Sequence, residues 1–241
     1  MDTKLKTGVP GLDEIFKGGI REKSAVLISG GPGTGKTIFA MQFLEEGAKR
    51  GEAGLFLIYD SSEENLLTYA DSLGINLRKY VQSGLVTIYK QPLLLRKVPT
   101  LPSPLQLLKN KKIKRVALDS LTMFAYVHVA DDKQYRSQII SFLEHMKEVT
   151  LLATAEAPGS NIDEADFRAE DFLFDGVVFL TKVRQEAHFE RVLHVSKMRG
   201  QEHILDIIPF TIGLKGISVY PSQLPFALIS KESSSSKLRV K

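Results

Sequence analysis

The sequence SAVLISGGPGTGKTIFAMQFLEEGAKRG at residues 24–51 decides the fold class. Its first seven residues form a short apolar run, which is typical of a buried β-strand. Glycines crowd the next stretch, and from residue 36 apolar residues recur at helical spacing until Gly51, which marks the helix end. A strand, a glycine-rich turn and a helix therefore follow one another here, as at the start of an α/β unit.

The same alternation of strand-like and helix-like segments continues through the first two-thirds of the chain. Apolar, β-branched runs predict strands at residues 54–60, 84–90, 115–120 and 149–156. Amphipathic patterns predict helices at residues 63–74 and 135–148, and a short helix before residue 115. Strands that alternate with helices favour a mostly parallel sheet flanked by helices on both faces, so the predicted fold class is α/β.

The pattern changes after Gly176, where strand-like segments follow one another with only short breaks. These segments are residues 176–183, 190–198, 203–212 and 216–221. The sequence IGLKGI at residues 212–217 is typical of a hairpin turn. We therefore expect antiparallel C-terminal strands appended to the parallel core within a single domain, residues 1–229. The serine-rich end, residues 230–241, lacks core-forming periodicity and is predicted to be a disordered tail.

Composition excludes several classes of protein. The 241 residues include no cysteine, which excludes disulfides and thiolate metal sites, and a net charge of +4 does not by itself indicate a nucleic-acid partner. No apolar run approaches the roughly 20 residues that span a bilayer, and the first residues lack the apolar segment of a secretory signal. We therefore expect a cytoplasmic protein without a membrane partner.

The glycine-rich turn matches the phosphate-binding pattern G-x-x-x-x-G-K-[ST] at Gly30, Gly35, Lys36 and Thr37. Glycines let successive backbone N–H groups turn inward around a phosphate, and the helix that follows directs the positive end of its dipole at the anion. Lys36 is expected to reach the terminal phosphates, and the Thr37 hydroxyl to bind Mg²⁺. The pattern therefore predicts binding of a nucleoside triphosphate. The predicted nucleotide-binding residues are Gly31, Pro32, Gly33, Thr34, Gly35, Lys36, Thr37 and Ile38.

A carboxylate for the metal ion is predicted at Asp119, which ends the apolar run RVALD. Ligands of open α/β sheets bind outside the carboxyl ends of the strands, so Asp119 and the glycine-rich turn are expected to meet there. Asp119 and Thr37 would then hold Mg²⁺, an ion that prefers oxygen ligands. The alternative is an aspartate that only caps the next helix. Thr154 and Glu156 end a neighbouring predicted strand, where they either sense the γ-phosphate or form a polar strand end without that role.

These motifs belong to an ordered series that runs from residue 7 to residue 221. TGVPGLDEIFKGGI opens the series, GGPGTGKT and RVALDS follow, and EDFLFDGVVFL, KMRGQEH and PFTIGLKGISVYP complete it. In this order the segments resemble the KaiC-like branch of the RecA/RadA ATPases. The resemblance implies a RecA-type P-loop core, ATP and Mg²⁺ as ligands, and assembly of identical subunits into a homo-oligomer, often a hexamer.

The resemblance also implies a role for the segment KMRGQEH, residues 197–203. In the family this segment lies at the subunit interface, and its basic residues reach the γ-phosphate bound to the neighbour. Lys197, Arg199 and His203 are the matching positions here. Cations supplied by a second subunit stabilise the charge on a transferring phosphoryl group. The alternative, from the residues alone, is a solvated basic turn.

The acid that activates water is where the chain departs from the family. Family members end the second core strand with two adjacent glutamates, and alignment on the downstream segment LGINL puts Asp60 and Ser61 at those positions. Asp60 is therefore the predicted base, acting directly or through one further water, and hydrolysis is expected to be slow. Glu63 and Glu64 come later, in the acidic first turn of a helix that Ser61 or Ser62 caps. Glu63 is the reserve candidate for the base.

Two further charged regions bear on nucleic-acid binding. A basic cluster precedes the strand that ends at Asp119, and it comprises Lys109, Lys111, Lys112, Lys114 and Arg115. Its position at the sheet edge opposite the phosphate site favours a solvated connection. The loop after residue 156 is acidic, which disfavours DNA phosphates there. The histidines without metal-ligand spacing, interpreted as surface or strand residues, are His128, His145, His188 and His194.

The sequence thus predicts an ATP-binding, KaiC-like ATPase with slow Mg²⁺-dependent hydrolysis at subunit interfaces, acting as a nucleotide-driven switch for an unknown protein partner. Its predicted catalytic residues are Lys36, Asp60, Lys197 and Arg199. Two alternatives stay open: a recombination or DNA-repair accessory protein that resembles the RadA paralogues, and an ATP-binding pseudo-ATPase without turnover. Salt-dependent binding to single-stranded DNA distinguishes the first, and tight ATP binding without turnover distinguishes the second.

Overall fold

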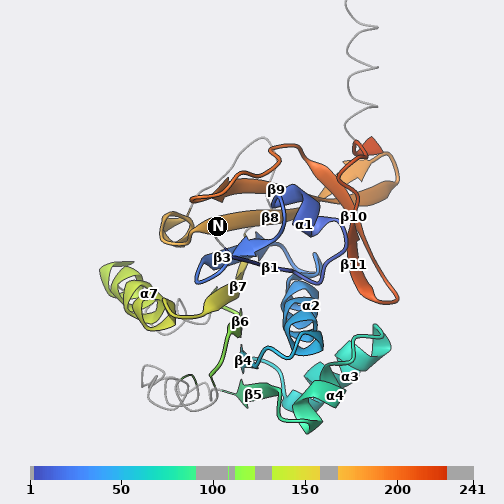
Figure 1. The fold of residues 1–241 in the computed structure, drawn as a ribbon. Helices are drawn as coiled ribbons and strands as arrows, with labels where there is room; N and C mark the ends of the chain where they lie inside the picture. The colour runs from blue at the N-terminus through green and yellow to red at the C-terminus, as the bar shows by residue number, and fades with distance from the viewer. Residues whose placement is uncertain (1–2, 91–107, 109–111, 123–131, 158–167, 227–241) are drawn as a thin grey trace, which may run out of the picture.

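A single nine-stranded sheet forms the centre of the molecule, with helices on both of its faces (Figure 1). The structure is a computed structural model, and it describes residues 3–90, 108, 112–122, 132–157 and 168–226. The strand order is β11-β10-β9-β8-β3-β7-β6-β4-β5, and the strands from β8 to β5 in this order are parallel. The antiparallel strands β9, β10 and β11 extend one side. This arrangement confirms the predicted fold class.

The elements have the following bounds. The strands are β1 (Lys4–Leu5), β2 (Ile20–Arg21), β3 (Ala25–Gly30), β4 (Gly54–Ile58), β5 (Val86–Lys90), β6 (Arg115–Asp119), β7 (Thr150–Glu156), β8 (Gly176–Gln185), β9 (His188–Met198), β10 (Ile208–Gly213) and β11 (Gly216–Val219). The helices are α1 (Leu12–Ile15), α2 (Lys36–Lys49), α3 (Glu63–Ser72), α4 (Leu77–Gln82), α7 (Asp132–Met146) and the 3₁₀-helix η1 (Ala169–Phe172). The predicted hairpin at residues 212–217 joins β10 and β11 and is confirmed.

Each face of the sheet buries its own apolar cluster. Val26 and Ile28 of β3 pack on the side of α2, whereas Leu27 packs on the side of α7. Figure 1 shows α2, α3 and α4 on one side of the sheet and α7 on the other. A strand that is buried on both faces reads as a continuous apolar run, which is why VLIS was visible in the sequence. The burial fixes β3 at the middle of the molecule.

Parallel pairing brings the carboxyl ends of four strands to one edge of the sheet. Gly30 of β3 is opposite Glu156 of β7, and Ile58 of β4 is opposite Asp119 of β6. Strand β7 lies between β3 and β6 and carries Thr154 two residues before its end. The carboxyl edge of a parallel sheet is where α/β proteins bind ligands. The register therefore gathers the predicted phosphate and metal residues.

Strand β10 begins later than the sequence predicted. The expected segment started at His203, whereas the strand starts at Ile208. The intervening chain packs on the N-terminal turn instead, because the Ile204 N–H donates to the carbonyl of Ile15. The Gln201 amide adds hydrogen bonds to the carbonyls of Phe16 and Gly19. The residues before Ile208 therefore make hydrogen bonds to the N-terminal turn and not to a neighbouring strand of the sheet.

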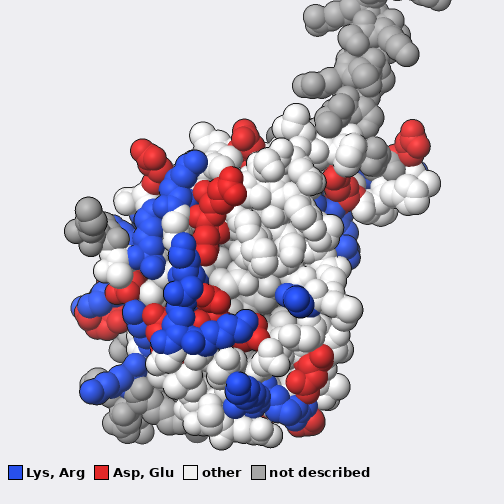
Figure 2. Space-filling view, turned by 45° about the vertical axis from the view of Figure 1, so that its right-hand side comes forward, with Lys and Arg blue, Asp and Glu red and all other residues white. Residues whose placement is uncertain are grey.

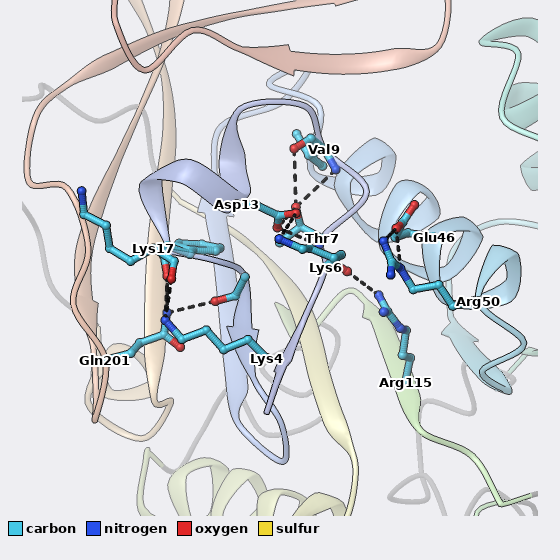
Figure 3. A network of polar contacts seen from close by, with 12 residues as sticks. Lys4, Lys6, Thr7, Val9, Asp13, Lys17, Glu46, Arg50, Arg115 and Gln201 are labelled. Atoms are coloured by element: carbon cyan, nitrogen blue, oxygen red, sulfur yellow. Dashed lines mark hydrogen bonds and ion pairs between the residues drawn. The ribbon is translucent and has the colours of Figure 1, made fainter. Parts of the chain in front are cut away.

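Arg115 contradicts the interpretation of the basic cluster as a solvated connection. Its side chain is fully buried and donates to Glu52 at 2.6 Å. It also donates to the Lys6 carbonyl at 2.6 Å (Figure 3). The guanidinium lies 4.8 Å from the centroid of the Phe43 ring. Gly47 of α2 makes room for it, since a Cβ there would lie 2.4 Å from Arg115 Cδ. Lys112 is exposed, as predicted.

Several predictions concern residues outside the described parts of the chain. They include the short helix before residue 115, the tail at residues 230–241, the middle of the acidic loop at 158–167, and Lys109, Lys111 and His128. His145 lies on α7, and His188 and His194 lie on β9, as expected for surface and strand positions. None of the helices in the described ranges combines the length and the hydrophobicity needed to cross a membrane.

Candidate phosphate and metal site

The glycine-rich turn connects the end of β3 to the first residue of α2. Gly33 and Gly35 adopt φ values of +69° and +101°, a conformation that side chains other than glycine disfavour. Gly35 is the N-cap residue of α2, so the unpaired N–H groups of the first helical turn face the loop. Ile38 is buried and anchors that turn in the core. The loop thus presents N–H donors and a helix dipole to an anion.

Lys36 lies folded over its own loop. Its ammonium donates to the carbonyls of Gly30 at 2.9 Å and Gly31 at 3.0 Å, and the Thr34 hydroxyl also donates to Gly31 at 2.8 Å. Burial lowers the pKa of the Lys36 ammonium below its usual range, while the carboxylates of Glu156 and Asp119 act in the opposite direction. A desolvated cation held by carbonyl oxygens is well placed to exchange them for phosphate oxygens.

Asp119 joins the phosphate loop to the next strand along the sheet. Its carboxylate accepts hydrogen bonds from the Thr37 hydroxyl at 2.7 Å and from the Thr154 hydroxyl at 2.5 Å. The prediction that Asp119 and Thr37 meet is therefore confirmed, and Thr154 fixes the carboxylate from the other side. A hydroxyl and a carboxylate oxygen side by side fit Mg²⁺, which binds few protein oxygens and takes its other ligands from phosphates and water.

A cleft of about 420 Å³ opens beside these residues. It is bounded by the phosphate loop, the ends of β4, β6 and β7, and one face of α3. The lining residues are Lys36, Thr37, Ile58, Asp60, Ser61, Asn65, Leu66, Tyr69, Asp119, Ser120 and Glu156. Asp60 and Glu156 thus face the same space as Lys36. Three carboxylates and one ammonium converge here, as expected where a metal and a polyanion bind together.

Replacing Asp60 with asparagine is expected to raise the melting temperature at neutral pH, without nucleotide or metal. Burial raises the pKa of Asp60 above its ordinary value of 3.8, and the carboxylates of Asp119 and Glu156 raise it further. A carboxyl group whose pKa is higher in the folded state costs stability when it is ionised in both states. The gain is therefore full above the raised pKa and fades as the pH falls toward 3.8. Thermal unfolding at neutral and acidic pH measures it, and a lower melting temperature at neutral pH would contradict this account.

The two glutamates that follow Asp60 do not enter the cleft. Ser62 is the N-cap residue of α3, and its hydroxyl accepts the Asn65 N–H at 3.1 Å. Glu63 and Glu64 occupy the first turn of this helix, as predicted, and Glu64 pairs with Arg78. Asp60 and Ser61 line the cleft, so the reserve candidate Glu63 is not at the site.

The segment with Lys197, Arg199 and His203 follows the end of β9, beside the amino ends of the parallel strands and opposite the phosphate loop. Met198 pairs with Gly176, which pairs with Val26 at the start of β3. Val26 is four residues before the phosphate loop, or about 13 Å at the rise of a strand. The segment therefore points away from the phosphate loop of its own subunit.

The Arg199 guanidinium donates to the Phe172 carbonyl at 2.7 Å in this arrangement. Burial lowers the pKa of the Lys197 ammonium, and the neighbouring Arg199 lowers it further, whereas Asp171 and Asp175 oppose the shift. The His203 ring buries its Nε2 atom without a hydrogen-bond partner among the described residues. Lys197 and Arg199 are thus close enough for their charges to interact.

Sequence reasoning missed Asn65 and Tyr69, which line the cleft from α3. They are four residues apart and so share a helix face, a pattern that is visible in the sequence. It also missed Lys182 of β8, whose ammonium donates to the Pro32 carbonyl at 3.1 Å. No local pattern indicates that contact, because it depends on the pairing of β8 with β3.

The fold and the site together define a class of protein. A glycine-rich phosphate-loop motif after the central strand of a mostly parallel sheet, with a carboxylate at the end of the second strand along, is the arrangement of a RecA-type P-loop ATPase core. The family model for the KaiC ATPase matches residues 5–224. The chain therefore belongs to the KaiC ATPase family, and it is an ATP-binding member of the RecA superfamily.

Individual relatives agree with this assignment. The circadian clock oscillator protein KaiC of Parasynechococcus marenigrum is 32% identical over 249 residues, which cover 90% of this chain and 45% of that protein. A UPF0273 protein of Thermotoga maritima is 30% identical over 92% of this chain and 98% of its own length. The crystal structure of a KaiC-like protein from Pyrococcus horikoshii matches with a TM-score of 0.80 and 32% identity, over 92% of this chain and 100% of that one. The chain thus spans about half the length of its KaiC relatives.

Proposed function

We propose that this protein hydrolyses ATP slowly with Mg²⁺, at sites completed between identical subunits, and acts as a nucleotide-driven switch. The observation that carries the proposal is the cleft in which Lys36, Thr37, Asp119 and Asp60 meet. Its parts correspond to the needs of phosphoryl transfer, namely a phosphate cradle, a metal carboxylate and an acid for the water. Membership of the KaiC ATPase family supports it.

Each part of the cleft has one task in this proposal. The N–H groups of the phosphate loop and the ammonium of Lys36 bind and orient the phosphates and offset their charge. Thr37 and Asp119 would hold Mg²⁺, which would offset negative charge on the phosphates. Asp60 accepts a proton from the attacking water, directly or through a second water, at a carboxylate oxygen that faces the cleft. The raised pKa of Asp60 suits proton acceptance.

Hydrolysis is expected to be slow because Asp60 replaces the longer glutamate of the family. A misplacement of about 1 Å costs on the order of a hundredfold in rate. Ser61 supplies a hydroxyl, and no second carboxylate, at the adjoining position. Positive charge that stabilises the transferring phosphoryl group comes from Lys197, Arg199 and His203 of a neighbouring subunit. These residues do not serve the phosphate loop of their own chain, since they lie far from it. The functional unit is therefore a homo-oligomer.

The test is phosphate release from ATP and Mg²⁺, measured against protein concentration. We expect turnover per subunit to rise as subunits assemble, and to fall about a hundredfold or more in both Asp60→Ala and Arg199→Ala. Arg50→Ala is the matched control, because Arg50 pairs with Glu46 at the surface end of α2, away from the cleft. Turnover that does not depend on protein concentration, or that survives Arg199→Ala, would contradict a site completed between subunits.

The pseudo-ATPase alternative rests on the same departure at Asp60 and Ser61. In that case ATP stabilises an interface and is not turned over. Tight ATP binding with no phosphate release, unaltered by Asp60→Ala, would establish it in place of the proposed hydrolysis.

The alternative of a DNA-binding accessory protein concerns the molecular surface. Figure 2 shows one face on which Lys and Arg side chains lie directly beside Asp and Glu, next to a broad area of uncharged residues. Mixed charges of this kind weaken attraction to a phosphate backbone, which favours one continuous sign. Binding of single-stranded DNA that falls steeply with salt would nonetheless favour the accessory role.

A further inference from the structure

Strand β8 continues past the phosphate loop and carries a lysine beside it. Leu180 of β8 pairs with Gly30, the last residue of β3. Lys182 is two residues beyond Leu180 and on the same face of the strand as Leu180. The Lys182 ammonium reaches the outside of the loop and donates to the Pro32 carbonyl at 3.1 Å. A Cβ on Gly33 would lie 3.2 Å from the same nitrogen. Lys182 therefore contacts the phosphate loop at Pro32.

Two ammonium groups consequently share three successive carbonyls of one loop. Lys36 donates to the carbonyls of Gly30 and Gly31, and Lys182 donates to that of Pro32. Their acceptors are adjacent residues of one short loop, so the two ammonium groups lie close together. Like charges at this distance repel each other, and an anion with several negative oxygens placed at the loop relieves the repulsion.

We propose that Lys182 binds the terminal phosphate of a nucleoside triphosphate in the same subunit that holds the nucleotide. This inference rests on the proposed nucleotide function and adds a cation supplied in cis to those expected from the neighbour. The flexible four-carbon side chain exchanges the Pro32 carbonyl for an oxygen of the γ-phosphate, an exchange that suits a compact ammonium with three donors. The subunit then distinguishes a triphosphate from a diphosphate before any neighbour arrives.

The competing role for Lys182 is a tether that only shapes the loop. A tether would support every phosphate that the loop holds, so its loss would weaken ADP and ATP alike. A γ-phosphate ligand would affect only the triphosphate, because ADP lacks the group that Lys182 contacts. The ratio of the two affinities therefore separates the two roles.

The experiment compares ADP with a non-hydrolysable ATP analogue, each with Mg²⁺, by calorimetric titration of the full chain. We expect Lys182→Met to weaken the analogue about tenfold or more and ADP less than about twofold, as loss of one charge-assisted hydrogen bond predicts. Lys182→Arg is expected to restore most of the preference, since it keeps the charge. Arg184→Met is the matched control, because Arg184 follows on the same strand face and donates to the Glu186 carbonyl of its own hairpin. Equal weakening of both nucleotides, or no weakening, would overturn the role.

The same samples separate this inference from the proposed hydrolysis. Wild-type protein that binds both nucleotides and releases no phosphate, with the analogue selectively weakened in Lys182→Met, supports the role of Lys182 and removes the ATPase. Wild-type protein that binds neither nucleotide overturns both. Melting temperatures within a few degrees of the wild type show that a changed affinity is not the result of unfolding.

Discussion

Replacing Lys36 with alanine is expected to weaken ATP binding at least about tenfold and to lower turnover about 10²- to 10³-fold. Lys36 is expected to contact the phosphates, because its partly buried ammonium is held over the loop by the carbonyls of Gly30 and Gly31. The truncated side chain leaves the charge of the β- and γ-phosphates without this partner. Titration with a fluorescent ATP analogue and phosphate release measure the two losses.

Lys49→Ala is the control on the same helix. Lys49 lies in the last turn of α2 and pairs with Glu45 at 2.9 Å, far from the loop. Its nucleotide affinity should equal that of the wild type. Wild-type ATP affinity in a folded Lys36→Ala protein would mean that the nucleotide binds somewhere other than this cleft.

Replacing Arg115 with alanine is expected to lower the free energy of unfolding by about 3–5 kcal/mol. The change removes one of the two donors of Glu52 and leaves the carbonyls of Lys6 and Phe43 without the guanidinium. Burial acts to raise the pKa of Glu52, but hydrogen bonds from Lys114 and Arg115 outweigh it and keep the pKa below the usual range. The Arg115→Ala substitution also removes the packing of the guanidinium on the Phe43 ring. Urea unfolding followed by circular dichroism gives the value.

Arg50→Ala tests whether burial is the cause. Arg50 also carries a guanidinium at 2.6 Å from a glutamate, Glu46, but its side chain is half exposed. It should lose about 1 kcal/mol or less, as surface pairs do. Equal losses for Arg50→Ala and Arg115→Ala would show that the buried network adds nothing to an ordinary ion pair.

Local patterns in the sequence were enough to predict much of the fold and part of the site. The phosphate loop, the strand before it and the helix after it follow from glycine spacing and apolar periodicity, which act over a few residues. Asp119 was predicted because it ends an apolar strand, and strand ends share an edge. The sequence predicted that Ser61 or Ser62 caps α3, and Ser62 is the residue that does so. The predicted helix start separated Glu63 and Glu64 from Asp60.

Other features depend on which strands pair and in what register. Lys182 reaches Pro32 only because β8 lies next to β3, 150 residues away in the chain. Arg115 stands in a run of lysines that predicts a solvated connection, yet it is buried because Gly47 on a distant helix leaves the space.

The predicted start of β10 was wrong for a similar reason, because the Ile204 N–H donates to the Ile15 carbonyl and not to a neighbouring strand. The sequence by itself determined most strands and helices from β3 onward, apart from α4 and η1, together with the phosphate-loop motif and the acid at the end of β6. Only the tertiary structure decided what lies next to them, because side-chain periodicity encodes the face of each element and not the identity of the residue that the face will meet.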